Sequence, residues 1–310
     1  MWRVEPICKV LNNEVGIQMS SSGYYAFKSR IPSIRKTRDK ELKEKITEIY
    51  EENFSCYGVV KMWHTLLNDG ESVGRERVRR LMRELGLRGA VRGKIKRTTI
   101  AGDKVISAED LVKRNFFANA PNRLWVADFT YVSTWEGWCY VAFIIDVFAR
   151  RIVGYDVSTS MTRAMVTRAF KMAIHTRYRE RHDDFSDLIH HNDKGSQYTA
   201  DDFVELLAVH DIRTSIGTVG DSYDNALAES MNGSYKTELV KNMGPWKSYE
   251  ELNAATAEWV YWHNNHCITE HNNFKPAVYI EEKWYSEKVD LRKKRRRSKR
   301  GKRNSPRNLG

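Results

Sequence analysis

Three apolar runs separated by short turns limit the folds open to this chain more than any other feature. They cover residues 124–132, 138–148 and 151–157, and they are rich in β-branched and aromatic residues. Runs of this kind, with Gly137 in the first turn and Arg150 in the second, are typical of a meander of three antiparallel strands. The aromatic residues at strand spacing are expected in its core: Trp125, Tyr131, Trp138 and Phe143.

An alternation of helices and short strands follows the meander. Apolar residues recur at helical spacing over 162–178, 199–210, 224–240 and 249–263, and short strands are expected at 188–191 and 212–216. This order predicts an α/β domain in which helices cover the faces of one sheet.

The region before residue 90 is predicted to be helical throughout. Helices are expected over 39–52 and 58–67, followed by a turn and a third helix from residue 74. Val78, Leu81, Met82 and Leu85 form a buried stripe on the third helix. Arginines lie on its other faces, among them Arg75, Arg79 and Arg83. The pattern resembles a helix-turn-helix whose last helix contacts DNA; a three-helix bundle with a basic surface is the alternative.

The positive charge of the chain is concentrated in two blocks. The chain has a net charge of +12, of which residues 292–307 contribute +11 and residues 75–97 contribute +8, so the remainder is acidic at −7. Two basic blocks on an acidic body indicate a polyanionic partner, most simply DNA. Lys293 and Arg296, in the block over 292–307, are candidate DNA contacts. The alternative is that both blocks are solvated charged faces.

Several classes of protein are excluded by the same sequence. No apolar run approaches the roughly 20 residues that a membrane-spanning helix needs, and no signal peptide is evident. The four cysteines lie far apart, which excludes a disulfide framework and a cysteine-rich zinc module: Cys8, Cys56, Cys139 and Cys267. We therefore expect a reduced, cytoplasmic protein with no membrane partner.

Three acidic residues lie at positions where a carboxylate indicates a function. Asp128 lies in the middle of an apolar strand, where an ionised carboxylate is costly unless it is paired or bound to a metal. Asp193 follows the strand at 188–191, and the carboxyl ends of strands are where α/β sheets place ligand sites. Glu229 lies on the helix over 224–240. The three are candidate catalytic and metal-binding residues.

The helix that carries Glu229 presents one polar face. Asn225, Glu229, Asn232 and Lys236 follow one another at i, i+4, i+7 and i+11. Lys236 lies about 10.5 Å along the helix axis from Glu229, which suits a phosphate on a bound DNA strand better than an ion pair with Glu229. Asn225, Asn232 and Lys236 are therefore candidate DNA contacts.

Carboxylates without histidine or thiol neighbours favour a hard cation. Mg²⁺ and Mn²⁺ prefer carboxylate oxygens, whereas zinc prefers His or Cys. Two such ions about 3.5–4 Å apart can stabilise both the attacking and the leaving oxygen of a phosphoryl transfer. The sequence therefore predicts a site for two Mg²⁺ ions, with Mn²⁺ as a substitute.

Other residues compete for these roles. Asp146 is also an acid within an apolar strand, but Arg150 or Arg151 is expected to pair with it, which favours a structural role. His191 is expected in the core rather than in catalysis. The cluster of His263, His266, Cys267 and His271 matches no common zinc pattern.

The motifs around the three acids resemble those of one family. VADFTY at 126–131, HHNDKGSQYT at 190–199 and DNALAES at 224–230 are similar to the three motifs of insertion-sequence transposases with a DDE, retroviral-integrase-type core. The match is to the second-frame (OrfB) proteins of the IS-three family. The 35 residues between Asp193 and Glu229 are the family's interval, and Lys236 corresponds to its basic residue after the glutamate. Asn192 stands where serine is usual, and WHNNHCIT at 262–269 lacks the arginines usual there.

The resemblance implies a fold and a reaction. It implies an RNase H-like core with a mixed five-stranded sheet, preceded by an all-α helix-turn-helix-like domain. It also implies bacterial, nucleoid-associated DNA nicking and strand transfer, a homo-oligomer on DNA, and an upstream-frame partner or fusion. A nuclease of the same fold and a non-catalytic DNA-binding relative are the alternatives. The expected segments are 1–37 (extension), 38–90 (helix-turn-helix-like), 91–120 (linker), 121–245 (core), 246–285 (helical extension) and 286–310 (basic disordered tail).

Overall fold

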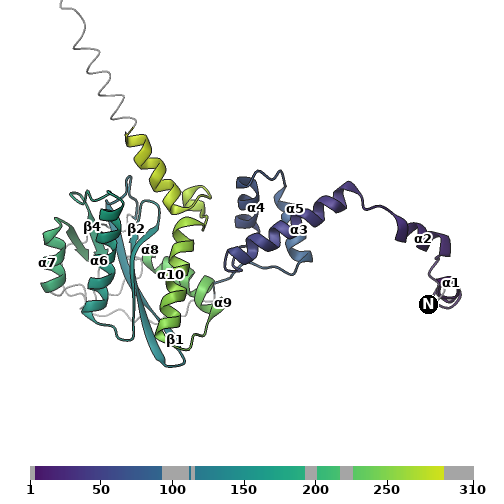
Figure 1. Ribbon diagram of the computed structural model, residues 1–310, viewed down its shortest axis with the longest axis horizontal. Helices are drawn as coiled ribbons and strands as arrows, with labels where there is room; N and C mark the ends of the chain where they lie inside the picture. The colour runs from purple at the N-terminus through teal and green to yellow at the C-terminus, as the bar shows by residue number, and fades with distance from the viewer. Residues whose placement is uncertain (1–3, 93–111, 113–115, 193–200, 217–225, 290–310) are drawn as a thin grey trace, which may run out of the picture. The chain divides into compact units, whose positions relative to one another are not determined.

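The computed structural model describes residues 4–92, 112, 116–192, 201–216 and 226–289 (Figure 1). The chain divides into two compact units, Met1–Glu48 and Ile49–Gly310, and each is described by itself. Among the described residues, no helix is both long enough and apolar enough to cross a membrane.

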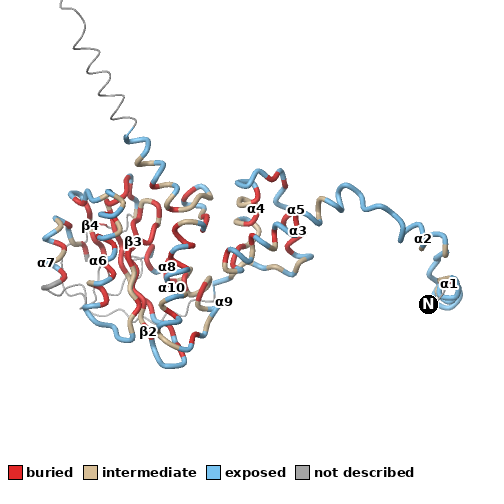
Figure 2. The backbone as a smooth tube through the Cα atoms, viewed as in Figure 1, coloured by how far each residue is buried: buried red, intermediate tan, exposed pale blue. Residues whose placement is uncertain are grey.

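The first unit is entirely helical in its described part. It holds α1 (Val4–Glu14), α2 (Ser21–Ser29) and most of α3 (Ile34–Glu52). The Ser20 hydroxyl accepts a hydrogen bond from the Gly23 amide at 3.0 Å and so caps α2. Most of α1 and α2 is exposed (Figure 2), and Cys8 is the one residue they bury, whereas α3 buries Leu42 and Ile46. The sequence analysis predicts α3 but neither α1 nor α2, because short helices that bury almost nothing leave little core pattern to detect.

The second unit begins with two short helices that contact each other, α4 (Val59–Asn68) and α5 (Arg75–Glu84). Gly70 joins them with a φ of +82°, a conformation that glycine adopts without strain. Three residues of the predicted apolar stripe are buried, Val78, Leu81 and Met82, whereas Leu85 at the end of α5 is half-buried. The predicted helix-turn-helix-like arrangement is confirmed.

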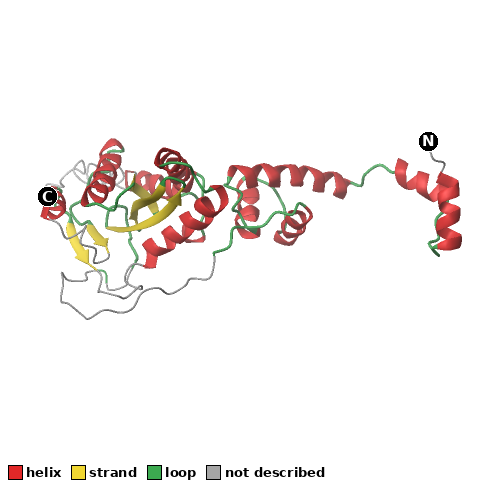
Figure 3. Cartoon of the chain, turned by 90° about the horizontal axis from the view of Figure 1, so that it is seen from below, coloured by secondary structure: helices red, strands yellow, loops and turns green. Residues whose placement is uncertain are grey.

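A mixed sheet of five strands forms the centre of the second unit (Figure 3). Its strands are β1 (Leu124–Thr134), β2 (Gly137–Asp146), β3 (Arg151–Ser158), β4 (Ile189–Asn192) and β5 (Arg213–Ile216). The order across the sheet is β3-β2-β1-β4-β5. The first three strands are antiparallel, and β4 and β5 add to β1 in parallel. The fold predicted for the core is therefore confirmed.

Helices cover both faces of this sheet (Figure 1). On one face, α6 (Arg163–Arg179) and α7 (Asp201–Val209) bury side chains against Trp125 and Ala127 of β1. Gly154 lets β3 approach α6 closely, since a Cβ there would lie 2.2 Å from the Ala169 carbonyl oxygen.

The other face of the sheet carries α8 (Ala226–Tyr235) and α10 (Tyr249–Asn265). Phe143 of β2 packs against the rings of Tyr235 and Trp259 there. The sequence predicts one helix over 224–240. Instead, α8 continues as a π-helical turn, η2 (Lys236–Val240), and then as α9 (Lys241–Met243). A π turn changes the angular position of the residues that follow, and such turns often occur at functional sites.

Two further predictions are corrected. Tyr131 and Trp138 were expected in the core, but they are 56% and 57% exposed, because only the other face of the strand pair, with Val132 and Cys139, is buried at this end. A helix over 277–289 runs past residue 285, where the sequence predicts the disordered tail to begin. Packing explains this helix, because Trp284 contacts the ring of Phe148 and the Lys288 ammonium lies 3.9 Å from the Trp284 ring centre.

Candidate active site

Asp128 lies half-buried in β1, at the point where the parallel part of the sheet ends. One carboxylate oxygen accepts a hydrogen bond from the Phe129 amide at 2.8 Å. The other accepts one from the side-chain amide of Asn232 at 2.9 Å. Neutral donors orient this carboxylate on both sides.

The register between β1 and β4 relates Asp128 to the second motif. Asn192, the last residue of β4, pairs with Ala127, the residue before Asp128. Asp193 is the next residue in the chain, but it lies outside the described residues. The sheet thus brings the backbone that leads into both motifs to the same position across two neighbouring strands.

The helix α8 brings the third motif to the same place. Asn232 contacts Asp128, and Glu229 precedes Asn232 by three residues, which is about 4.5 Å along the helix axis. Glu229 is exposed on the helix surface. The segment of α8 that carries Glu229 therefore lies against the strand that carries Asp128.

Lys236 lies beyond Asn232, at the start of the π turn. Its ammonium lies 4.5 Å from the centre of the Tyr131 ring. Burial lowers the pKa of Lys236, and the nearby Asp128 carboxylate opposes that effect. The same Lys236 side chain is therefore close to both an exposed ring and the Asp128 carboxylate.

The remaining predicted DNA contacts fall in two groups. Arg75, Arg79 and Arg83 lie exposed on α5, away from its buried stripe, and Glu76 forms an ion pair with Arg79 at 3.1 Å. Three predicted contacts lie outside the described residues: Asn225, Lys293 and Arg296.

Asp146 has a structural environment, as predicted, but with a different partner. Its carboxylate bonds the Arg177 guanidinium at 2.8 Å, and neither side chain is accessible. It also accepts hydrogen bonds from the backbone amide of Asn122 and from the Trp125 indole. The prediction that Arg150 or Arg151 pairs with Asp146 is wrong, because α6 inserts Arg177 beneath the sheet.

Arg177 also ties the C-terminal helix to the core. It bonds both carboxylate oxygens of Glu281, at 2.6 and 2.8 Å, and Glu281 also bonds Arg151 at 2.7 Å. Burial opposes charge on Glu281, but the two guanidinium groups hold the pKa of this carboxyl below its usual range. The cluster is a buried ionic network that joins α6, β3 and the helix over 277–289, which is a structural function.

The histidines considered as rivals lie in packed positions. His191 is buried, and its Nδ1 lies 2.9 Å from the Ser215 hydroxyl. The Nε2 of His263 lies 3.2 Å from the Arg150 carbonyl oxygen, and burial lowers the pKa of His263 to about 4. Across the described ranges, no group of three or more His, Cys, Asp or Glu side chains is placed to hold a metal. The cluster at 263–271 therefore forms no zinc site.

One contact to α8, the helix that carries Glu229, was not predicted from the sequence. The Arg92 guanidinium donates hydrogen bonds to the Ser230 carbonyl and to the Ser230 and Ser234 hydroxyls of α8, at 2.7, 3.2 and 3.0 Å. Gly233 permits this approach, because a Cβ there would lie 3.2 Å from the guanidinium carbon. Arg92 falls in the predicted linker, where nothing in the sequence pattern distinguishes it from its basic neighbours.

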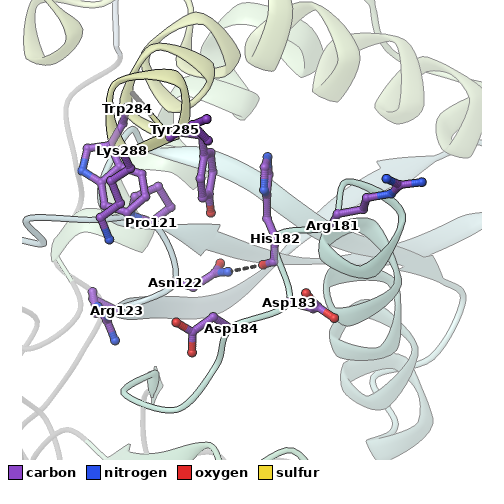
Figure 4. A pocket seen from close by; sticks show the side chains of 11 residues that line it. Pro121, Asn122, Arg123, Arg181, His182, Asp183, Asp184, Trp284, Tyr285 and Lys288 are labelled. Carbon is purple, nitrogen blue, oxygen red and sulfur yellow. Dashed lines mark hydrogen bonds between the residues drawn. The ribbon is translucent and has the colours of Figure 1, made fainter. Parts of the chain in front are cut away.

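A pocket of about 290 Å³ opens elsewhere on the second unit (Figure 4). Segments 121–123, 181–184 and 284–289 line it, and none of the predicted site residues does. The His182 ring stacks on Tyr285 at 3.5 Å, and the Asn122 amide donates to the His182 carbonyl at 2.6 Å. The pocket and the Asp128 region are thus lined by different residues.

The second unit defines a class of protein: an integrase core with a helix-turn-helix-like region before it. The family model "Integrase core domain" matches residues 118–222, and a second integrase-core model matches 210–266. The family model "HTH-like domain" matches residues 37–94. The HTLV-2 integrase catalytic core in complex with magnesium covers 53% of this chain and 99% of its own, at 18% identity and a TM-score of 0.41.

Sequence relatives narrow the class to a family. A putative transposase for insertion sequence element IS986/IS6110 of Mycobacterium tuberculosis is 49% identical over 270 residues, which cover 87% of this chain and 97% of the relative. The transposase for IS629 of Shigella sonnei is 46% identical, with 82% of this chain and 83% of the relative covered. The chain belongs to the insertion-sequence transposases, and the IS-three family fits it.

Proposed function

We propose that this chain cuts DNA at the ends of an insertion sequence and joins them to a target, with Asp128, Asp193 and Glu229 as the catalytic carboxylates. The hydrogen bond from Asn232 to Asp128 carries the proposal, because it holds the helix of Glu229 against the strand of Asp128. The pairing of Asn192 with Ala127 supports the inclusion of Asp193, which follows Asn192 in the chain.

The donor set fits two Mg²⁺ ions, with Mn²⁺ as a substitute. Asp128 is half-buried and Glu229 is exposed, and carboxylate oxygens are the ligands that these cations prefer. When bound, such ions lower the pKa of a water or a 3′-hydroxyl and stabilise charge on the departing 3′ oxygen.

Two phosphoryl transfers make up the reaction. In the first, water attacks a phosphodiester at the element end, the bond from phosphorus to the 3′ oxygen breaks, and a 3′-hydroxyl is released. In the second, that hydroxyl attacks a target phosphodiester and a new bond to phosphorus forms. The target's own 3′ oxygen leaves with a proton. Asn232 orients Asp128, while Lys236 and Asn225 hold phosphates of the bound strand.

Basic side chains outside the core supply further DNA contacts in this proposal. Arg75, Arg79 and Arg83 of α5 lie on a duplex, and Lys293 and Arg296 of the basic tail contact phosphates. Each contact releases counterions, so deletion of residues 292–310 reduces the salt dependence of DNA binding. A homo-oligomer holds both ends, together with an upstream-frame protein or fusion, in the bacterial cytoplasm at the nucleoid.

A strand-transfer assay tests the proposal. A supercoiled plasmid with the two element ends is incubated with wild type and with Glu229→Gln in Mg²⁺ and in Mn²⁺, each with and without the fused upstream frame. Joined products that vanish with Glu229→Gln support the proposal. Joined products that persist contradict the assignment of Glu229.

The same assay separates the alternatives. Nicked plasmid without joined product favours a nuclease of the same fold. A folded, DNA-bound protein that yields no product in any lane favours a non-catalytic DNA-binding protein derived from a transposase.

A further inference from the structure

Two large aromatic side chains lie exposed on the hairpin that carries Asp128. Tyr131 of β1 and Trp138 of β2 are 56% and 57% exposed, and their ring centres are 5.4 Å apart. The rings meet at 77°, an arrangement in which the edge of one ring lies against the face of the other. Exposure of this much aromatic surface indicates an interaction site rather than a core.

The hairpin holds these rings on a fixed backbone. At its tip, the Trp135 and Glu136 amides donate to the carbonyls of Trp246 and Lys247 at 3.0 and 3.2 Å. Within the turn, the Thr134 hydroxyl donates to the Gly137 carbonyl at 2.9 Å. The rings therefore project from a strand pair that is anchored on both sides of its turn.

A cation joins this aromatic pair to the catalytic strand. The Lys236 ammonium lies 4.5 Å from the Tyr131 ring centre and is close enough to Asp128 for the two charges to interact. The ammonium lies over one face of the Tyr131 ring, next to the exposed surface of Trp138. Exposed aromatic surface with an ammonium beside it is the chemistry that binds a nucleotide, since a base stacks on a ring and the phosphate pairs with the cation.

We propose that Tyr131, Trp138 and Lys236 bind an unpaired nucleotide of the DNA end. Tyr131 follows Asp128 by three strand residues, about 10 Å along β1, so the two side chains start on opposite faces of the strand. Lys236 relates them, because its ammonium lies over the Tyr131 ring and interacts with the Asp128 carboxylate. A base inside a duplex has both faces stacked, so these rings select a base that has left its pair. This inference rests on the proposed function, because it places the nucleotide beside the bond that is cut.

The experiment measures binding without cleavage. Full-length protein is mixed, without divalent metal, with a duplex that ends in three unpaired nucleotides, one of them 2-aminopurine, and with a blunt duplex. Trp138→Ala and Tyr131→Ala are expected to abolish the quenching of 2-aminopurine and to weaken binding of the unpaired end by roughly 5- to 100-fold. Binding of the blunt duplex stays unchanged, and Trp138→Phe retains the quenching.

Tyr279→Ala is the matched control. Tyr279 is 49% exposed and has the Lys275 ammonium 5.9 Å from its ring centre, but it lies on the helix over 277–289. It is expected to bind both duplexes like wild type, and thermal melts verify that each variant folds.

Three outcomes overturn the inference. They are equal weakening on both duplexes, no change on either, and a change in oligomeric state with Trp138→Ala, which assigns the rings to contacts between copies. Failure of the proposed function gives a different result: wild type then quenches 2-aminopurine but forms no joined product in Mg²⁺ or Mn²⁺.

Discussion

Asp128 and Asp146 are both acids in apolar strands of one sheet, and their surroundings differ in kind. Asp146 is inaccessible, and a guanidinium, two backbone amides and an indole bond it. Asp128 is half-buried and accepts hydrogen bonds from neutral amides. A carboxylate that bonds a buried guanidinium is structural, whereas a half-buried carboxylate that neutral amides orient is suited to a cation.

Replacement of each aspartate by asparagine is expected to give the largest effects, and it tests whether Asp128 is catalytic and Asp146 structural. Asp128→Asn removes a charged ligand and is expected to lower the strand-transfer rate by at least about 1000-fold, since metal charge stabilisation amounts to several kcal/mol. The melting temperature stays near that of wild type. Asp146→Asn is expected to lower the melting temperature instead. Wild-type rates from folded Asp128→Asn would show that Asp128 is no metal ligand.

The structural side of the comparison predicts a large loss of stability. Arg177→Met leaves the carboxylates of Asp146 and Glu281 without their shared guanidinium and is expected to cost about 3–5 kcal/mol of unfolding free energy. Urea unfolding measures it. Arg168→Met is the control, because the pair between Arg168 and Asp156 lies at the surface and is expected to contribute about 0–1 kcal/mol. Equal losses in the two variants contradict the assignment.

Asn232 tests whether the neutral donor at Asp128 has a catalytic consequence. Asn232→Ala removes the hydrogen bond to Asp128 and is expected to reduce activity or metal affinity roughly 10- to 100-fold, the range found for groups that orient metal ligands. The readout is the strand-transfer rate against Mg²⁺ concentration, whose midpoint rises.

Asn264→Ala is the control for that experiment. Asn264 bonds the backbone of Ile152 at 2.9 and 2.8 Å, so its loss lowers stability but leaves the Mg²⁺ midpoint in place. Identical Mg²⁺ midpoints for Asn232→Ala and wild type would assign Asn232 a purely structural role.

Local pattern predicted the sheet, the helices that cover it and the polar face that carries Glu229. It could not predict the partner of Asp146, because Arg177 lies 31 residues further along the chain and reaches Asp146 only when α6 packs on the sheet. For the same reason it could not predict that the side-chain amide of Asn232, a candidate DNA contact, bonds Asp128.

Exposure was the other quantity that local pattern could not supply. Tyr131 and Trp138 have the spacing of core residues, but at this end of the hairpin only the opposite face of the strands is buried. Asp193 and Asn225 lie outside the described residues, so their roles stay predictions.

Substitution of Arg92 is expected to have the smallest effect on the strand-transfer rate. It tests whether the support of α8, which contacts Asp128 through Asn232, affects activity. Its three hydrogen bonds hold α8 near Glu229, and their net loss in Arg92→Ala is expected to be about 1 kcal/mol, or roughly a fivefold lower strand-transfer rate. Gly233→Ala is expected to have the same effect by displacing the guanidinium, although alanine favours the helix itself. Because both substitutions remove the same contact, between Arg92 and α8, the double variant should be no slower than either single variant.

Arg88→Ala is the control for DNA electrostatics, because it removes the same charge from the same segment. A fivefold lower rate for Arg88→Ala as well would assign the effect of Arg92 to DNA binding.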